Sequence, residues 1–223
     1  MELKKMDSYD VTDLRSLEKL EPVRVRPGMY IGSTGNKGLH HCIWEIIDNS
    51  IDEISNGFGD KVTITINEDK SITILDNGRG IPTGIHPTKK KSGVEMVFTE
   101  LHTGGKFDNK NYKTSGGLHG VGAAVVNALS KFLEVEVYQN GKVYRQRFEY
   151  AYDKELKRDM PGTPVTDLEI VGKSIKTGTK VTFKPDNEIF STTDFKFDII
   201  DERLQELAFQ NKGIRLELID KRK

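Results

Sequence analysis

The chain has 223 residues, of which 35% are hydrophobic and 30% charged, and its 34 basic residues balance 34 acidic ones. This length suffices for one large domain or two small ones with a substantial core. A net charge of zero gives no overall field toward nucleic acid or an anionic membrane. The single cysteine, Cys42, excludes an intrachain disulfide and favours a reducing compartment. No apolar run could span a bilayer and no apolar signal core begins the chain, so we expect a cytoplasmic protein without membrane association.

The first 26 residues predict an N-terminal arm. Apolar residues recur at a spacing of three (Val11, Leu14, Leu17 and Leu20), which indicates a short amphipathic helix. Pro27 and Gly28 interrupt this pattern, and residues 35–38 are expected to form a loop. The pattern leaves open whether the arm packs on its own domain or on a partner.

Residues 39–58 predict the first long helix. Four isoleucines fall on one side and form the expected buried stripe, namely Ile43, Ile47, Ile51 and Ile54. Glu45 and Asn49 lie one turn apart on the other side. A solvated acidic face is the ordinary explanation, but an asparagine in mid-helix costs propensity without adding charge. The pair would suit a carboxylate base beside an oxygen ligand for a hard cation.

Two alternating segments, 61–67 and 71–75, predict an antiparallel hairpin that ends at Asp76. Asp76 begins an Asp-Asn-Gly sequence, so a simple turn residue is one interpretation. As a functional residue, its carboxylate at a strand end would accept a hydrogen bond from a ligand amine. Gly78 and Gly80 would then let a flat ring approach the backbone.

A glycine-rich segment, 116–122, leads directly into an apolar helical pattern over 123–129. Backbone N–H groups at such a helix start favour an anion such as phosphate, although a flexible surface loop fits the segment equally well by itself. Residues 103–115 have few apolar anchors and predict a mobile lid. Lys106 and Lys113 in that lid either meet an anion or face water. The lysine run 89–91 is expected to be a solvated loop.

The remaining elements predict an α+β fold with helices on one face of a sheet. Segments 133–138 and 142–148 form a hairpin around Asn140-Gly141, a strong turn signal. Residues 150–164 are polar and are expected to form an irregular insertion. A helix over 94–101, a strand over 180–184, a helix over 197–210 and a last strand over 214–219 complete the prediction.

Four motifs in this order resemble the GHKL ATPases, which include gyrase, Hsp90 chaperones, sensor histidine kinases and MutL proteins. The motifs are Glu45-x-x-x-Asn49, Asp76-x-Gly78-x-Gly80, Gly117-x-x-Gly120-x-Gly122 and Gly178-Thr179. Longer stretches (22–32, 39–41, 76–86, 101–107 and 112–122) resemble the B subunits of bacterial type IIA DNA topoisomerases, that is, of DNA gyrase or topoisomerase IV. The resemblance runs from about Tyr9 to Lys223. The sequence departs from the usual pattern of these subunits at residues 52–57 and 150–164.

The resemblance implies a Bergerat fold, an α/β sandwich in which a mixed, mainly antiparallel sheet carries helices on one face. Residues 1–26 would be a dimerisation arm and 27–223 the ATP-binding domain, with the transducer and DNA-cleavage domains absent. The implied function is Mg²⁺-dependent ATP hydrolysis that drives DNA strand passage in the full enzyme, with weak ATPase activity for this chain alone. The implied partners are the topoisomerase A subunit, DNA, a second B protomer, and adenine-site inhibitors such as aminocoumarins.

The resemblance also assigns roles to residues. Glu45 would be the general base, with His41 orienting or polarising the water, and Asn49 would help to hold Mg²⁺. Asp76 would read the adenine amine with Thr179 acting through water. Gly80 and Pro82 would border the ring, Glu53 and Arg79 would pair across the pocket, and Arg145 would lie at its mouth. The phosphates would be cradled by Lys106, Lys113, Gly117, Leu118, His119, Gly120, Val121, Gly122 and Ala123. Tyr9 would reach the nucleotide of the other protomer.

Other classes of protein are alternatives to a topoisomerase subunit. A nucleotide-gated dimerisation module with little catalysis, chaperone-like or MutL-like, shares these motifs. A histidine kinase catalytic domain is disfavoured by Glu45. A Walker phosphate loop is excluded because no Gly-Lys-Ser/Thr follows the glycines, and a Rossmann site is disfavoured because no strand leads directly into Gly117. The sequence does not separate gyrase from topoisomerase IV.

Overall fold

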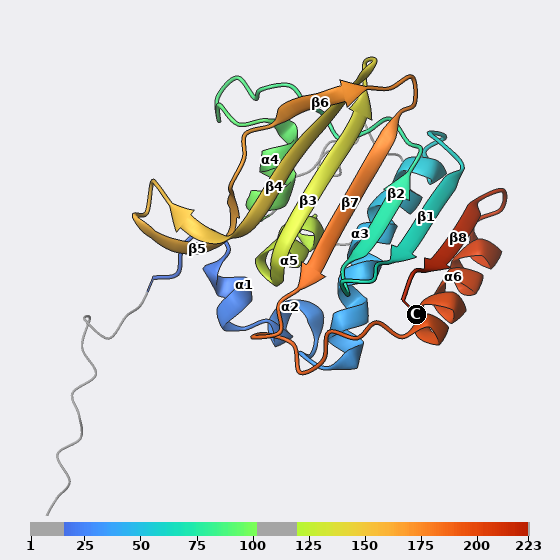
Figure 1. The fold of residues 1–223 in the computed structure, drawn as a ribbon, viewed down its shortest axis with the longest axis horizontal. Coiled ribbons are helices and arrows are strands. Elements are labelled where there is room, and N and C mark those ends of the chain that lie inside the picture. The colour runs from blue at the N-terminus through green and yellow to red at the C-terminus, as the bar shows by residue number, and fades with distance from the viewer. Residues whose placement is uncertain (1–15, 102–119, 223) are drawn as a thin grey trace, which may run out of the picture.

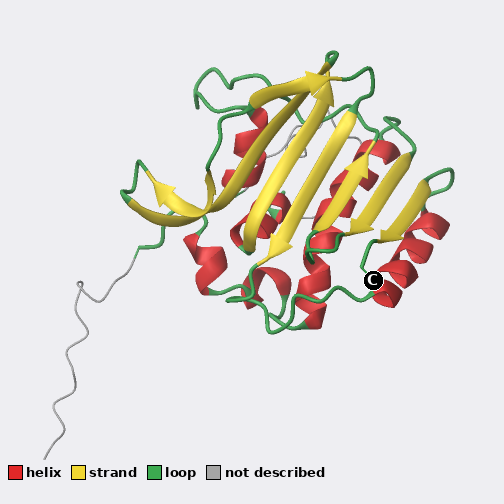
Figure 2. Cartoon of the chain, viewed as in Figure 1, coloured by secondary structure: helices red, strands yellow, loops and turns green. Residues whose placement is uncertain are grey.

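The computed structural model describes residues 16–101 and 120–222 of the chain. Within this part, eight strands form one sheet in the order β5-β4-β3-β7-β2-β1-β8, and β6 pairs with β4. The helices α3, α4 and α5 lie behind the sheet, and its other face is open (Figures 1 and 2). The predicted α+β class, with helices on one face of the sheet, is therefore confirmed.

The helices of the described residues are α1 (Glu21–Val25), α2 (Gly28–Ile31), α3 (Asn36–Ser55), α4 (Gly93–Thr99), α5 (Gly122–Ala128) and α6 (Phe197–Gln210). The first strands are β1 (Lys61–Ile66), β2 (Ile72–Asp76), β3 (Ser130–Gln139) and β4 (Lys142–Asp153). The remaining strands are β5 (Arg158–Pro164), β6 (Glu169–Lys173), β7 (Gly178–Pro185) and β8 (Arg215–Asp220).

The core lies between α3 and the covered face of the sheet. Ile43 and Ile47 of α3 are fully buried, Ile51 is nearly so, and Ile54 packs at the edge of the same cluster. This agrees with the predicted stripe. Alternate residues of the β1–β2 hairpin are buried against it, namely Val62, Ile64, Ile66, Ile72 and Ile74. Because Asp76 continues this alternation, its side chain also lies on the covered face.

The last strand joins the sheet by a parallel pairing. β8 pairs in parallel with β1, whereas β1 and β7 each pair antiparallel with β2. β7 and β8 therefore run in the same direction, which requires a crossover connection. The helix α6 supplies it, and its bounds agree with the predicted 197–210.

The prediction of an irregular insertion over 150–164 is wrong. β4 continues to Asp153, and β5 pairs with it antiparallel after a tight turn. The Asp153 carboxylate stabilises that turn by accepting the backbone N–H groups of Glu155 and Leu156, at 2.9 and 3.0 Å. The polar composition arises because much of this hairpin faces solvent, and only Asp153 and residues 160–163 are buried.

Both ends of α3 also differ from the prediction. α3 begins at Asn36, after Gly35, so the loop expected over 35–38 is three residues too long. The helix ends at Ser55 and not at Phe58. The strand β6 was not predicted from the sequence. Its residues do not alternate between buried and exposed, so the sequence lacks the period-two pattern that indicates a strand.

The beginning of the described chain packs on its own domain. Leu20 and Val23 are buried in the core. Arg158 forms a bidentate pair with Glu21, which lies in α1. The segment from Leu20 onward is therefore part of the domain's own packing, a question that the sequence pattern left open. The rest of the expected arm, including Tyr9, lies outside the described residues.

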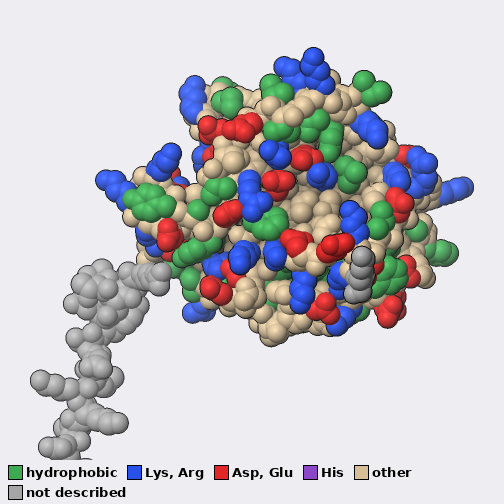
Figure 3. Space-filling view, in the orientation of Figure 1, with side chains coloured by type: hydrophobic (Ala, Val, Ile, Leu, Met, Phe, Trp, Pro, Cys, Tyr) green, Lys and Arg blue, Asp and Glu red, His purple; other side chains and the backbone are tan. Residues whose placement is uncertain are grey.

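The open face of the sheet carries intermixed charges (Figure 3). Basic and acidic side chains pair across neighbouring strands, as Lys61 does with Glu217 at 2.7 Å and Lys180 with Glu136 at 2.5 Å. These pairs neutralise one another, so this face does not form a basic surface. Among the described helices, none has the length and apolar character needed to cross a membrane.

Candidate active site

Glu45 and His41 form the first part of the site. Both lie on α3, one turn apart, and His41 Nε2 is 3.0 Å from Glu45 Oε1. The Glu45 side chain is 32% exposed and that of His41 is 39% exposed, so water can reach the carboxylate. The hydrogen bond with Glu45 raises the pKa of His41 above its ordinary value. The imidazole thus holds the carboxylate in one orientation, as a general base requires.

The start of α5 lies directly against this carboxylate. A Cβ atom built at Gly122 would be 1.9 Å from Glu45 Oε2, closer than any real contact. Only glycine allows this approach, so the end of the glycine-rich segment is placed beside Glu45. Val121 precedes the helix and Ala123 is buried within it. Gly117, Leu118, His119, Lys106 and Lys113 lie outside the described residues, as does the predicted lid.

Asn49 lies one turn beyond Glu45 on α3 and is partly buried. In the described part of the chain, no three His, Cys, Asp or Glu side chains come together as a metal cage. Mg²⁺ is a hard cation that takes oxygen ligands, and in nucleotide sites the phosphates and water supply most of them. The single amide oxygen of Asn49 fits that donor set.

Asp76 forms the buried part of the site. Its Oδ1 accepts the N–H groups of Gly78 at 2.9 Å and Thr179 at 3.1 Å, and its Oδ2 accepts the hydroxyl of Ser50 at 3.0 Å. The residue is 7% exposed. Burial raises its pKa, with a smaller contribution from the charge of Glu53, whereas the three hydrogen bonds oppose the rise. The Gly78 contact is the turn contact that the sequence suggested, but the other two come from α3 and β7.

The packing of the protein itself leaves little room for side chains at the two glycines after Asp76. Gly80 has a φ of +85°, and a Cβ there would be 2.9 Å from Val137 Cγ1. At Gly78 a Cβ would lie 3.2 Å from the Glu53 side chain. These positions thus let α3, β3 and the strand-end loop come together, in addition to any approach of a ring. Pro82 follows in this loop and is exposed. The backbone N–H of Ile81 donates to Thr179 Oγ1 at 3.3 Å.

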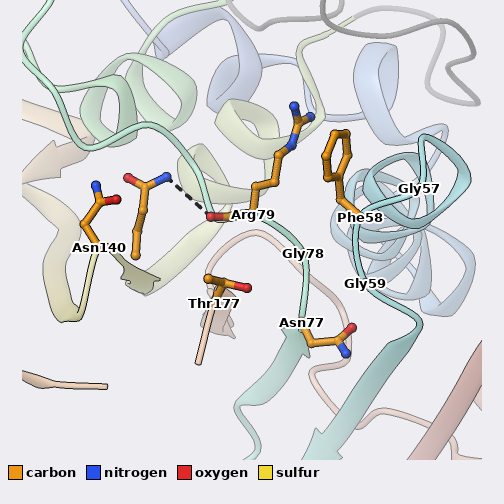
Figure 4. Close-up of a pocket in the computed structure, with 9 residues that line it drawn as sticks. Gly57, Phe58, Gly59, Asn77, Gly78, Arg79, Asn140 and Thr177 are labelled. Atoms are coloured by element: carbon orange, nitrogen blue, oxygen red, sulfur yellow. Dashed lines mark hydrogen bonds between the residues drawn. The ribbon is translucent and has the colours of Figure 1, made fainter. Parts of the chain in front are cut away.

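Glu53 and Arg79 form an ion pair, as the resemblance implied. Arg79 Nη2 is 2.5 Å from Glu53 Oε1, and Arg79 Nε also donates to this carboxylate. The guanidinium lies 3.7 Å over the ring of Phe58, which Figure 4 shows facing it. A pocket of about 490 Å³ opens beside this pair, at the residues that follow Asp76. It is lined by Gly57, Phe58, Gly59, Asn77, Gly78, Arg79, Gln139, Asn140 and Thr177.

The structure does not bring Arg145 to this pocket. On β4 the neighbouring Gln146 and Phe148 are buried toward the helices, so strand alternation turns Arg145 to the open face. There it is in register with Glu136 of β3. The β3–β4 hairpin instead contributes Gln139, whose Nε2 donates to the carbonyl of Arg79 at 3.3 Å (Figure 4).

Sequence reasoning missed Ser50, Phe58 and Gln139. Ser50 falls about 140° around α3 from Glu45, at the edge of the isoleucine stripe. A hydroxyl at that buried edge was a usable signal, because buried hydroxyls need a partner. Gln139 is the last residue of β3 and Phe58 lies three residues beyond the end of α3, where periodicity does not fix the side-chain direction.

Residues 34–189 match the family described as histidine kinase-, DNA gyrase B-, and HSP90-like ATPase. Because this match covers more than half of the chain, the protein belongs to that family of ATPases. The predicted resemblance to topoisomerase B subunits is also confirmed. The chain is 56% identical, over 99% of its length, to the B subunit of DNA topoisomerase 4 from Staphylococcus epidermidis. It is 53% identical, over 98% of its length, to the DNA gyrase B subunit of Halalkalibacterium halodurans, and 51% identical over 97% to that of Thermotoga maritima.

The chain spans about a third of the length of these relatives, 32%, 33% and 32% respectively. The identities to the topoisomerase 4 and gyrase subunits are similar, so they do not separate the two.

Proposed function

We propose that this chain is the ATP-binding and ATP-hydrolysing domain of a bacterial type II DNA topoisomerase B subunit, of gyrase or of topoisomerase IV. The observation that carries the proposal is the position of Glu45. Its carboxylate is held by His41, is open to water, and lies against the first residue of α5. This helix follows the glycine-rich segment, so a phosphate at its start would lie beside a general base.

The buried end of the site supports adenine as the nucleobase of the ligand. Asp76 offers a carboxylate acceptor in a low-dielectric environment, where a hydrogen bond from an amine is strengthened. Thr179 lies next to it and accepts the N–H of Ile81 through its hydroxyl. Gly80 and Pro82 border the ring in this proposal, and Glu53 and Arg79 pair across the pocket.

In the reaction, Glu45 takes a proton from the water that attacks the γ-phosphorus. The bond between this phosphorus and the bridging oxygen breaks, and ADP leaves with the electron pair. His41 keeps the Glu45 carboxylate aimed at the water. When bound, Mg²⁺ would offset charge on the triphosphate, with Asn49 as a protein ligand. Lys106, Lys113 and the N–H groups of 117–123 are the proposed contacts to the phosphates.

The activity of the whole enzyme is a further part of this proposal. ATP binding would join two B protomers, with Tyr9 of one reaching the nucleotide of the other, and residues 1–26 would act as the dimerisation arm. Hydrolysis would be coupled to DNA strand passage together with the A subunit, in the cytoplasm. Adenine-site inhibitors such as aminocoumarins would compete with ATP. The relatives are about three times longer, so we expect weak ATPase activity and no strand passage from this chain alone.

The test is Glu45→Gln, with Glu206→Gln on the surface of α6 as the matched control. We expect Glu45→Gln to reduce ATP turnover by about a hundredfold or more, because the amide cannot take the proton. ATP affinity, measured by calorimetry, should change little, and Glu206→Gln should behave like the wild type. Turnover that survives in Glu45→Gln would show that the base is another group. ATP bound by the wild type without turnover would favour a nucleotide-gated interaction module, and no ATP binding would overturn the proposal.

A further inference from the structure

We propose that Ser50 is a positioning residue for nucleotide recognition, which fixes the oxygen of Asp76 that faces the adenine amine. The inference rests on the proposed function and adds a residue to it. Ser50 lies on α3, one residue after Asn49, and its Oγ donates to Asp76 Oδ2 at 3.0 Å. The two side chains are almost completely buried, at 3% and 7% exposure.

The acceptor sites of the Asp76 carboxylate show why one oxygen is selected. A carboxylate has about four lone-pair sites, two on each oxygen. Oδ1 accepts two backbone N–H groups, from Gly78 and Thr179. Oδ2 accepts the Ser50 hydroxyl, and among the described residues this is its one hydrogen bond. Oδ2 therefore keeps a lone pair for a ligand, and the three donors together prevent the carboxylate from rotating.

The hydroxyl of Ser50 is used in an uncommon way for a helical serine. Such hydroxyls commonly bond back to the carbonyl four residues earlier. Ser130, which is buried at the start of β3 just after α5, also bonds in this way, with Oγ donating to the Val126 carbonyl at 2.6 Å. Ser50 instead reaches from α3 to the end of β2, and its neighbours on the helix, Ile47 and Ile51, are buried. Its hydroxyl thus links the helix that carries Glu45 to the strand that carries Asp76.

The link also favours the ionised form of Asp76. Burial raises the pKa of this carboxyl, the negative charge of Glu53 on α3 adds to the rise, and the Ser50 hydrogen bond opposes it. Arg79 in the strand-end loop offsets the charge of Glu53. The strand neighbours, Val62 of β1 and Thr179 of β7, are uncharged. Without the hydroxyl, protonation of Asp76 should begin at a higher pH, and the protonated acid is a weaker acceptor for an amine.

The experiment measures ATP affinity from about pH 8 down to about pH 5 for Ser50→Ala, Ser50→Thr and the control Ser130→Ala. We expect Ser50→Ala to bind ATP about three- to tenfold more weakly near neutral pH, with a larger loss as the pH falls. Ser50→Thr keeps the hydroxyl and should restore the wild-type pH profile. Ser130→Ala removes another buried hydroxyl and should leave the profile unchanged, which separates positioning from general destabilisation.

A second measurement does not depend on nucleotide. The Asp76 carboxyl carbon is titrated by NMR in the wild type and in Ser50→Ala, and we expect its midpoint to move to higher pH in the variant. An unchanged midpoint, or an ATP pH profile in Ser50→Ala that matches the wild type, would overturn the role of Ser50. Absence of ATP binding in the wild type would instead overturn the proposed function, whatever the carboxyl titration shows.

Discussion

The adenine end and the phosphate end of the proposed site differ in burial. Asp76 is 7% exposed and accepts three hydrogen bonds from three separate parts of the chain. Glu45 and His41 are about a third exposed, and they hold each other within a single helix. The comparison shows how a nucleotide site can divide its tasks. Recognition of the adenine requires a fixed acceptor that is shielded from water, whereas attack on phosphorus requires access for water.

The largest expected effect on ATP affinity is at the buried end, in Asp76→Asn. The amide oxygen can still accept from Gly78 and Thr179, and the amide nitrogen can donate to Ser50, so the fold should be kept. The acceptor for the adenine amine becomes a donor, and ATP should bind about tenfold to a hundredfold more weakly by calorimetry. Asp69→Asn is the control, because Asp69 accepts the Ser71 N–H at 3.0 Å at the opposite end of β2. Equal ATP affinity in the two variants would make Asp76 a turn residue only.

Asp76→Asn also tests how much the buried negative charge lowers the stability of the fold. Since burial raises the pKa of Asp76 in the folded state, its contribution to stability is present below the ordinary aspartate pKa. That contribution is lost as the pH rises through the raised value. The ionised carboxylate is therefore a cost at neutral pH, and Asp76→Asn should resist urea at least as well as the wild type. Marked destabilisation would show that the negative charge itself stabilises the fold.

A smaller effect is expected at the open end, in Gly122→Ala. The added Cβ would fall on the Glu45 carboxylate, which is at the end of a flexible side chain and can move aside. Turnover should fall by about tenfold because the base is misplaced, while ATP affinity should fall less. Gly172→Ala in β6 is the control, since its Cβ would meet only Val143 at an ordinary 3.7 Å. Wild-type turnover in Gly122→Ala would show that Glu45 need not keep this position.

The smallest effect is the contribution of the pair of Glu45 and His41 to stability. Because the hydrogen bond that His41 donates to Glu45 raises the pKa of His41, the imidazole should titrate above its ordinary value in an NMR experiment. Glu45→Gln should lower that midpoint. The stability from this pair is fully present below the ordinary histidine pKa and is lost as the pH rises through the raised one. Both groups are partly exposed, so the change in stability should be slight. An identical midpoint in Glu45→Gln would contradict the pairing in solution.

Local spacing in the sequence was enough to predict much of the fold. The isoleucine stripe of α3, the β1–β2 hairpin and the turn at Asn140-Gly141 follow from repeat period and turn chemistry. In that turn, Asn140 and Gly141 both have positive φ values, 54° and 77°, which two-residue hairpins favour. The positions of Glu45, Asn49 and Asp76 on their elements follow from the same local rules.

The tertiary structure decided what these elements bring together. The contact of Ser50 with Asp76, the approach of Gly122 to Glu45, and the parallel pairing of β8 with β1 join residues far apart in the chain. The same holds for Arg145, which the register of β4 turns to the open face, and for Gln139, which lines the pocket instead. Helix and strand periods fix which residues share a face of one element. They do not fix how elements cross or in what register strands pair, because packing of the whole core determines both.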